Sequence, residues 1–566
     1  MLYFFIPIIL ISFLLKVIIN NNVRNKYDCV ELIGFVTVIW AIELFIVTEL
    51  LSLFMCVDKT HLVFAWGIVD CCTLFVLATF LIKNHIPLLM PFRSEIEFGK
   101  IVIKNKKVDL IPYLLFVVLG ALVLAVSIRT VPYNADSLAY HLPRIQMWAQ
   151  NKTVAHFATP DYRQISSPVL AEFVNLHVYI FSGNDIFFNL VQSISYVFNS
   201  FMVYCIAKRR LLSQRGALVA TFMAMSTPIA LAEAFNTQVD LFTTVWMMVF
   251  AYEMLVLSEK SEISIGEDVF RIIIMGLCMG LGYITKQSVC IEMVVFSIIL
   301  LIVRMRKKDD FKELIYSIAT VLITSLIVVA PEIVRNIFTF GAVAAPQVGK
   351  NQLIGTLSPG FLLVNFIKNL LFNLPFSFFE GSQDIVYFIV YAFAGVLHVN
   401  LNSEFISECG QPYVINSPTI YTHDMAINPL NVWLLIISTI VMIVSLLKKR
   451  RCWSGFEWAI CLSYCAMLTL LRWEPYDTRY QISYLMLIPI LVVATLEKVL
   501  PENSGKLFAI YGVIGFICTS SFYNVFRFHA NLSTHEAGIR PAGYYSMVGQ
   551  FREQQAISSF INQKKI

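Results

Sequence analysis

The feature that most constrains this chain is a long series of apolar runs, most of them about 17 to 25 residues long. Folded as an α-helix, a run of this length spans the roughly 30 Å hydrocarbon core of a bilayer. The sequence therefore predicts an all-α polytopic membrane protein with roughly fourteen transmembrane helices. The runs cover residues 2–19, 29–55, 62–82, 110–128, 186–206, 216–232, 237–257, 271–284, 288–303, 313–331, 430–447, 456–471, 480–499 and 507–522.

Composition supports this interpretation, because 58% of the 566 residues are hydrophobic and only 14% are charged. Soluble domains carry about 25% charged residues. The sequence also lacks the roughly ten-residue alternating segments that are typical of a transmembrane β-barrel. Basic clusters are short and lie between apolar runs, which argues against nucleic acid as a partner. The 12 cysteines form no CxxC pair and no His/Cys ligand spacing, so no zinc site is predicted.

Four connections rich in lysine and arginine indicate the orientation of the chain in the membrane. Positive residues hold loops in the cytoplasm, so alternation of the spans places the C-terminal tail and residues 129–185, 332–429 and 472–479 on the outer side. Two apolar pieces of the longest outer segment, 361–376 and 385–397, suit helices that lie at the membrane interface. The basic connections are KNKK (104–107), KRRLLSQR (208–215), RMRKK (304–308) and KKRR (448–451).

The stretch YNADSLAYHLPRIQMWAQ (133–150) directly follows a predicted span and is unusually rich in polar residues. Asp136, Tyr140 and Arg144 recur every four residues and therefore share one face of a helix. We expect an interfacial helix whose polar face is turned to an outer cavity. The local pattern leaves two interpretations of Asp136 open, an N-cap of this helix or a catalytic carboxylate. His141 and Arg144 are equally open between headgroup contacts and a role in chemistry.

Other predicted outer segments add acids, amides and isolated cations to the same membrane surface. Each segment alone resembles an ordinary solvated loop, but together they predict one site built from several loops. A carboxylate there could accept a proton from an attacking hydroxyl, and cations could neutralise a departing phosphate. The residues are Asp161, Arg163, Gln164 and Glu172 in the first outer segment, then Glu233, Asn236, Gln238 and Asp240, Lys286, Arg335 and Asn336, Asp424 and Asn428, and Arg472, Glu474, Asp477 and Arg479.

The chain resembles the bacterial integral-membrane glycosyltransferases of the GT-C superfamily. The resemblance covers roughly residues 110–500 and is closest to the branch akin to protein O-mannosyltransferases and to lipid-A or polysaccharide sugar transferases. It is carried by NADSLAYHLPRIQMWAQNKTVAHFATPDYRQISSPVLAEF, NTQVD, TKQS, RNIFTFG, HDMAINPL and RWEPYDTRYQISY.

This resemblance implies a GT-C-like helical bundle in a bacterial plasma membrane, with an active site on the extracytoplasmic side. It also implies a polyprenyl-phosphate-linked sugar as donor, inversion on transfer, and a glycan, lipid or protein as acceptor. The essential acid of the family's first outer loop matches Asp136, which is therefore the expected catalytic base. Two features depart from the family: Ala135 and Ser137 replace a paired second acid beside Asp136, and the first three spans precede the usual core.

Further roles follow for the remaining outer residues, and three parts of the chain are expected. The parts are 1–109 with the first spans, 110–500 with the catalytic core, and 501–566 with the last span and tail. Unpaired outer cations are expected to bind the donor phosphate: Lys286, Arg335 and Arg479. Sugar or acceptor contacts are expected from Tyr140, His141, Arg144, Arg163, Gln164, Glu172, Asp240, Asn336, Asp424 and Asn428.

Metal is expected to be dispensable, because three cations are available and no DxD motif is present. Mg²⁺ or Mn²⁺ could bind only if the fold brings Asp136 and Asp240 together, since such ions take carboxylates plus substrate phosphate. Two alternative functions stay open. A transporter or flippase of lipid-linked sugars would use acids within spans, such as Glu43, Glu49 and Asp70. An O-antigen-type polymerase or ligase would depend chiefly on outer arginines and histidine.

Overall fold

The computed structural model describes residues 2–22, 28–84, 111–132, 134–210, 212–260, 265–305, 311–346, 352–376, 379, 381–448, 453–501 and 504–535. Within these ranges the chain is helical, and the only strand-like features are two isolated β-bridges, Leu353 with Leu471 and Ser407 with Trp473. The basic connection 104–107, parts of those at 304–308 and 448–451, and the tail after residue 535 lie outside them.

Nine helices in the described part of the chain are long and apolar enough to cross a membrane, and shorter apolar helices accompany them. The prediction of an all-α membrane protein is therefore confirmed, whereas the number fourteen stays a prediction. The longer helices are α1 (Leu2–Asn22), α2 (Cys29–Leu53), α3 (Lys59–Lys83), α5 (Ile111–Arg129), α9 (Leu190–Arg209), α12 (Asp240–Glu259), α13 (Ile265–Tyr283), α14 (Ser288–Met305), α15 (Phe311–Phe340), α18 (Pro429–Leu447), α20 (Ile482–Val499) and α21 (Gly505–His535).

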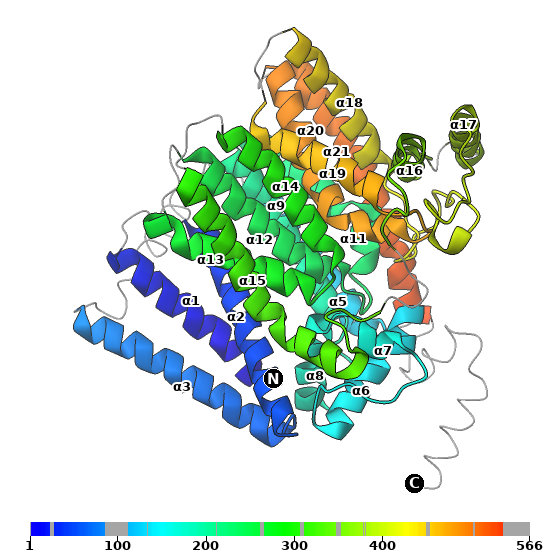
Figure 1. Ribbon diagram of the computed structural model, residues 1–566. Coiled ribbons are helices and arrows are strands. Elements are labelled where there is room, and N and C mark those ends of the chain that lie inside the picture. Colours follow the sequence, from blue (N-terminus) through cyan, green and yellow to red (C-terminus); the bar gives the residue numbers. More distant parts are fainter. Residues whose placement is uncertain are drawn as a thin grey trace.

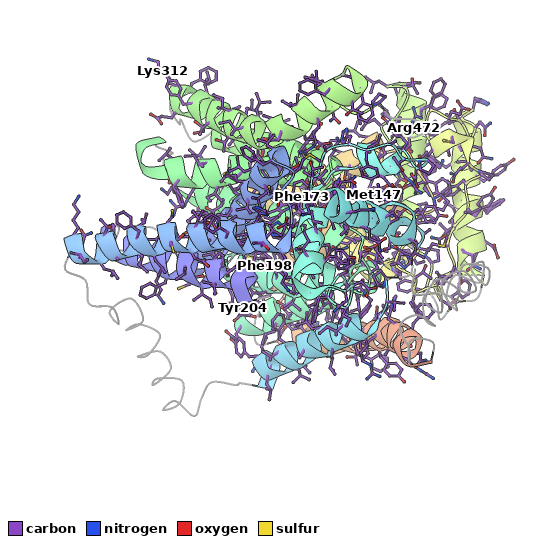
Figure 2. All side chains as sticks on the ribbon, turned by 90° about the horizontal axis from the view of Figure 1, so that it is seen from below. Met147, Phe173, Phe198, Tyr204, Lys312 and Arg472 are labelled. Atoms are coloured by element: carbon purple, nitrogen blue, oxygen red, sulfur yellow. The ribbon has the colours of Figure 1, made fainter. Side chains whose placement is uncertain are left out.

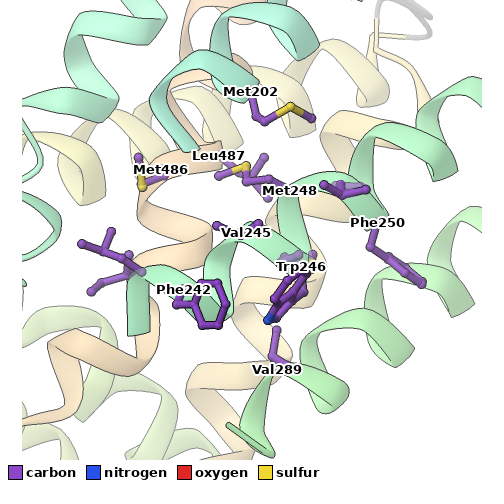
Figure 3. Packing of buried hydrophobic residues seen from close by; sticks show 14 of the residues in the cluster. Met202, Phe242, Val245, Trp246, Met248, Phe250, Val289, Met486 and Leu487 are labelled. Carbon is purple, nitrogen blue, oxygen red and sulfur yellow. The ribbon is translucent and has the colours of Figure 1, made fainter. Parts of the chain in front are cut away.

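The centre of the bundle is built on α12 and α20, whose side chains are buried on almost every face. A helix that is apolar all round must be surrounded by other helices or lipid. Figure 3 shows Phe242, Val245 and Trp246 of α12 packed near Met486 and Leu487 of α20. These two helices also begin beside the polar residues Asp240 and Arg479, so the rigid centre of the protein fixes part of the candidate site.

The first three helices lie together along one side of the bundle, coloured blue in Figure 1. They are joined to the core through α2, which contacts α8 (Leu170–Ser182), α12 and α13. Arg271 of α13 is fully buried and its Nε donates to Glu31 of α2 at 2.5 Å. An ion pair so well shielded from water requires both partners, so α2 is an integral part of the packed structure.

Small residues allow α13 to pack closely against α15. A Cβ added to Gly276 would lie 2.8 Å from Cβ of Thr324, and one added to Gly280 would lie 2.7 Å from Cβ of Val328. Glycines four residues apart on one face let helix backbones approach in this way. Any larger residue at either position would push α15 away from the bundle.

Two shorter helices, α16 (Pro359–Leu371) and α17 (Ser382–Val396), lie on the side of the molecule away from α3 (Figure 1). They confirm helices in the stretches predicted to be interfacial, 361–376 and 385–397. A separate small apolar core, which includes Phe372, Val390 and Trp473, holds them against the loop that follows. This loop leads back to α18 and the candidate site.

The helices differ from the sequence prediction in several places. The run 216–232 is broken, because Pro228 begins a new short helix, α11 (Pro228–Glu233), after α10 (Gln214–Met225). The span predicted at 313–331 continues through Pro331 to Phe340 as α15. Arg335 therefore lies within a helix and not in the loop after it. The segment 129–185 was expected to be a loop, but it contains the apolar helix α8.

Candidate functional site

A polar cavity of about 220 Å³ lies where several segments that are distant in the sequence meet. It is bounded by the segment before α6 (Leu142–Asn151), the start of α8, the turn before α12, the α13–α14 turn, and the start of α20. Polar lining residues include Asp136, Tyr140, His141, Tyr162, Arg163, Glu172, Gln238, Lys286, Gln352, Arg479 and Tyr480. The prediction of one site built from many loops therefore agrees with this geometry.

The chain around Asp136 already follows a helical path, with φ −66° and ψ −42° at this residue. Its side chain makes no cap hydrogen bond; the amide of Ser137 instead donates to Oδ1 of Asn134 at 2.7 Å. One π-helical turn, Ser137–His141, then leads into α6, where Pro143 occupies the first turn. The N-cap interpretation of Asp136 is therefore wrong, and its carboxylate is left available to the cavity.

Both oxygens of the Asp136 carboxylate accept hydrogen bonds from other segments. Oδ2 accepts from Nη1 of Arg479 at 2.9 Å and from Nε2 of Gln238 at 3.0 Å. Oδ1 accepts from Nη1 of Arg163 at 3.1 Å. Burial would raise the pKa of this carboxyl, but Arg479 and the Gln238 hydrogen bond outweigh burial and hold the pKa well below its usual range. Asp136 is consequently an anion across the whole physiological pH range.

A second ion pair lies beside the first one. The ammonium of Lys286 donates to Asp240 at the start of α12 and lies 3.7 Å from the ring centre of Tyr480. Burial lowers the pKa of Lys286, and Asp240 opposes that effect. Arg479 is attracted electrostatically by both Asp136 and Asp240, so the fold does bring these two acids around one cation. An incoming anion would meet two cations and an aromatic ring here.

A histidine–carboxylate–arginine chain forms the wall of the cavity on the α6–α8 side. His141 Nδ1 lies 2.5 Å from Oε1 of Glu172, and the same oxygen accepts from Arg144. Arg144 is fully buried and also donates to the carbonyl oxygens of Ser167 at 2.7 Å and Pro168 at 2.8 Å. Arg144 thus fixes the backbone at the start of α8, while His141 and Glu172 reach the cavity.

The packing of α6 on α8 holds this wall in place. Trp148 contacts Phe173 with ring centres 5.4 Å apart, and the guanidinium of Arg144 lies 5.0 Å from the Trp148 ring centre. Figure 2 labels Met147 of α6 and Phe173 of α8 close to one another in the middle of the bundle. An apolar contact between two helices therefore sets the positions of polar residues on their adjoining faces.

Seven of the predicted site residues do not line the cavity: Arg144, Gln164, Asp240, Arg335, Asn336, Asp424 and Asn428. Arg335 donates to Glu49 at 2.6 Å and to Glu332 at 2.7 Å. Asn336 is buried on α15, and Asn428 is buried where its side chain accepts from the amide of Ile229. Gln164 supports the site from behind, because its Nε2 donates to the carbonyl oxygen of Ala139 at 2.9 Å.

The predicted donor cations were expected to be unpaired, and this expectation is wrong. Lys286 pairs with Asp240, Arg479 with Asp136 and Asp424, and Arg335 with two glutamates. Asp424 lies 3.5 Å from Nη1 of Arg479 and so contacts the site through that arginine. Lone cations cannot be recognised from a sequence, because their partners come from segments far away in the chain.

Some residues of the cavity were absent from the predicted set. Tyr480 covers Lys286, and Tyr162 and Gln352 complete the rim. Gln238, which binds Asp136 directly, was named among the outer polar residues but was given no role. The side-chain amide of Gln352 donates to the hydroxyl of Tyr480 at 3.3 Å. Tyr480 is adjacent to the predicted residue Arg479, so proximity in sequence was the only signal for it.

The carboxylates of the cavity are engaged by protein nitrogen atoms. Within the part of the chain that the structure describes, no group of three or more His, Cys, Asp or Glu residues is arranged to hold a metal ion. A divalent ion at Asp136 would compete with Arg479, Gln238 and Arg163, since both carboxylate oxygens already accept hydrogen bonds. That metal is dispensable stays a prediction.

Comparison with known proteins gives one family match. Residues 166–334 match the family described as dolichyl-phosphate-mannose-protein mannosyltransferase. This segment contains Glu172, Gln238 and Lys286 of the cavity lining, and Asp240, which pairs with Lys286. The match supports the resemblance to GT-C membrane glycosyltransferases that the sequence motifs indicate. No significant match was found among curated proteins.

Solved structures give more distant similarities. ArnT from Cupriavidus metallidurans bound to undecaprenyl phosphate shares 14% identity, with 81% of this chain and 73% of that chain covered and a TM-score of 0.41. The archaeal oligosaccharyltransferase AglB from Archaeoglobus fulgidus, in complex with an inhibitory peptide and a dolichol-phosphate, shares 11% identity. The comparison with AglB covers 74% of this chain and 56% of that chain, with a TM-score of 0.43.

Proposed function

We propose that the protein is a membrane glycosyltransferase that moves a sugar from a polyprenyl-phosphate-linked donor to an acceptor at the outer face of the membrane. The observation that carries the proposal is the meeting of a carboxylate and cations from distant segments in a single cavity. Asp136 supplies the carboxylate, and Lys286 and Arg479 supply the positive charge. The family match over 166–334 supports the reaction class, because that family is described by a dolichyl-phosphate-linked sugar.

In the proposed reaction an acceptor hydroxyl attacks the anomeric carbon of the donor sugar from the face opposite the phosphate. The bond from that carbon to the phosphate oxygen breaks, its electron pair leaves with polyprenyl phosphate, and the configuration inverts. Asp136 accepts the proton of the attacking hydroxyl, a role in which general bases contribute about 10²–10⁴-fold. The strong hydrogen bonds to Asp136 keep it ionised and oriented before the acceptor arrives.

Lys286 and Arg479 are proposed to contact the donor phosphate, because both line the cavity and both are attached to the ends of packed helices. Preorganised cations stabilise charge that develops on a leaving group without reorganising during the reaction. Their present partners, Asp240 and Asp136, would share them with the substrate. Arg335 was expected to act with them, but its guanidinium is engaged by Glu49 and Glu332 outside the cavity lining.

Sugar and acceptor hydroxyls are proposed to contact Tyr140, His141, Arg163 and Glu172. These four residues line the cavity and come from the segments around α6, α7 and α8. Arg163 lies over the Tyr140 ring at 5.0 Å and pairs with Asp161 at 2.7 Å. It is half-exposed, so it can move when a substrate enters. The remaining members of the predicted set, Asp240, Asp424, Arg144 and Gln164, would act by holding these groups in position.

Reconstituted proteoliposomes test the proposal directly. Purified protein is supplied with radiolabelled polyprenyl-phosphate sugars and with a panel of lipid, glycan and peptide acceptors. Release of free polyprenyl phosphate together with labelled acceptor is the expected result. Movement of unaltered lipid-linked sugar between leaflets, without cleavage, would instead establish a flippase. Consumption of only oligosaccharide-diphosphate lipids would establish a polymerase or ligase.

A further inference from the structure

Far from the polar cavity along α5, the helices α5, α9, α10 and α21 enclose an apolar cavity of about 300 Å³. Its walls are almost entirely hydrocarbon, contributed by side chains such as Phe116, Leu218, Phe222 and Ile514. A void lined in this way does not hold ordered water, because it offers a water molecule too few hydrogen-bond partners. Apolar chains are the ligands that such a surface accommodates.

A second cavity of about 220 Å³ lies at the start of α10 and α21, lined by Ser213, Gln214, Arg215, Phe508 and Tyr511. Helical spacing joins the two cavities into one path. On α10, Arg215, Leu218 and Phe222 share a face. On α21, Phe508, Tyr511 and Gly515 do the same. With a rise of 1.5 Å per residue, the apolar wall extends roughly 10 Å beyond Arg215.

The boundary between the two cavities is marked by tyrosine hydroxyls. Tyr113 and Tyr204 lie within hydrogen-bond distance, with their oxygens 2.9 Å apart, and the side-chain amide of Gln214 donates to Tyr113. Tyr113 and Tyr204 are both half-buried, so this boundary is not sealed inside the bundle. A polar entrance, a belt of aromatic hydroxyls and an apolar interior follow one another along the path.

Arg215 at this entrance differs from the neighbouring arginines in its partners. Arg209 and Arg210 are held by the carboxylates of Glu259 and Glu457. Arg215 is exposed and lies 4.9 Å from the ring centre of Phe508, and no described carboxylate pairs with it. A guanidinium with free N–H groups beside an apolar groove is complementary to an anionic headgroup that carries hydrocarbon chains.

We propose that this groove is a binding site for one anionic phospholipid. The phosphate contacts Arg215 and Gln214, the glycerol region lies at the Tyr113–Tyr204 pair, and an acyl chain fills the apolar cavity as far as Gly515. The site does not depend on the proposed glycosyl transfer. If that transfer is also correct, the lipid supports it, because α5 ends at Arg129 and leads directly to Asp136.

Native mass spectrometry of the full chain in detergent, titrated with palmitoyl-oleoyl-phosphatidylglycerol, tests the site. Arg215→Ala removes the charge, and binding is expected to fall at least about tenfold, as for a lost hydrogen bond to a charged group. Gly515→Phe fills the apolar end. A Cβ at Gly515 meets no atom within 4 Å, so this ring enters open space and is expected to exclude the acyl chain.

Two matched controls lie on α21 itself. Arg527 also stacks on a neighbouring aromatic ring, with its guanidinium 5.9 Å from the ring centre of Tyr523. A Cβ at Gly512 likewise meets no atom within 4 Å, and Gly512 lines neither cavity. Arg527→Ala and Gly512→Phe are therefore expected to bind the lipid as the unmodified chain does.

Selective loss of the tightly held phosphatidylglycerol in Arg215→Ala and in Gly515→Phe supports the site. Unchanged binding in both variants overturns it. Equal losses in test and control variants also overturn it, because they would show only the general lipid shell of a membrane protein. Size-exclusion profiles establish that each variant is folded before titration, and transfer activity is measured separately, so failure of this site is distinguishable from failure of the proposed function.

Discussion

Nη1 of Arg479 donates a 2.9 Å hydrogen bond to Oδ2 of Asp136, although 343 positions separate the two residues in the chain. Asp136 lies in the turn before α6, and Arg479 lies in the short helix that leads into α20. Because α20 forms the centre of the bundle, this bond ties a surface segment to the most rigid part of the protein. The candidate site is therefore fixed by packing that is complete before substrate binds.

Asp136→Asn is expected to lower sugar transfer by about 10²–10⁴-fold, which is the contribution of a general base. Asparagine keeps the size of the side chain and can still accept from Gln238, so folding and membrane insertion are expected to survive. Initial transfer rates in proteoliposomes, with protein amounts matched by immunoblot, measure the effect. Near-normal turnover would rule out Asp136 as the base.

Asp161→Asn is the matched control for that variant. Asp161 pairs with Arg163, as Asp136 does, but it does not line the cavity. The control is expected to retain most of the transfer activity. A loss as large as that of Asp136→Asn would mean that the orientation of Arg163, and not the Asp136 carboxylate, limits the reaction.

Lys286→Gln is expected to weaken donor use, because it removes one of the two cations that are proposed to contact the donor phosphate. The KM for the polyprenyl-phosphate sugar should rise about tenfold or more, as for a lost hydrogen bond to a charged group, while the KM for acceptor changes little. Arg335→Gln serves as the comparison, since Arg335 is bound to Glu49 and Glu332 outside the cavity lining. It is expected to lower thermal stability and leave the donor KM unchanged. If Arg335→Gln raised the donor KM more than Lys286→Gln, the donor phosphate would bind at Arg335 on α15 and not at Lys286.

Transfer is expected to continue in excess EDTA, because Lys286 and Arg479 already supply positive charge and both oxygens of Asp136 accept N–H donors. The measurement is the initial rate with and without chelator, after dialysis in metal-free buffer. If activity disappears and returns with Mg²⁺ or Mn²⁺, Asp136 is a metal ligand and releases at least one of its nitrogen partners when the ion binds.

Lys368→Met is expected to alter the pH dependence of stability around α16 and the loop after α17. The ammonium of Lys368 is fully buried and donates to the carbonyl oxygen of Leu401 at 2.7 Å and to Oγ of Ser407 at 2.6 Å. Burial lowers the pKa of Lys368 from its usual 10.5 to about 7. Between these values the folded state binds fewer protons than the unfolded state, so stability rises as pH increases.

Thermal unfolding measured from pH 7 to pH 9 checks this sign. The Lys368 contribution should raise the melting temperature of the unmodified protein with pH, and Lys368→Met should lose that rise while being less stable overall. Lys152→Met is the control, because Lys152 is an exposed lysine that pairs with Asp58 at 3.1 Å. An unaltered pH profile in Lys368→Met would show that Lys368 keeps an ordinary pKa.

The sequence predicted the type of fold because hydrophobic length is a local property. Runs such as 480–499 needed no partner to be recognised as helices, and the outer helices at 361–376 and 385–397 were found in the same way. The ends of helices were harder to predict at prolines, because a proline can either begin a helix or lie inside one. Pro228 begins a helix after a break, whereas Pro331 lies inside α15 and does not end it.

The composition of the candidate site was also partly readable from the sequence. Asp136, Tyr140, His141, Arg163, Glu172, Lys286 and Arg479 were all predicted and all line one cavity. Arg335, Asn336 and Asn428 belonged to the same predicted set and lie elsewhere. Local patterns can place a polar residue near a membrane surface, but they cannot show the direction in which its side chain points.

By itself the sequence determined that this chain is an α-helical membrane protein with its polar residues gathered into a few connections, because the lengths of apolar runs and the positions of charges are properties of neighbouring residues. Only the tertiary structure decided which charges meet. It paired Asp136 with Arg479, Lys286 with Asp240, and Arg335 with Glu49. Ion pairs act over a few ångströms between segments hundreds of residues apart, so their partners are set by how the helices pack.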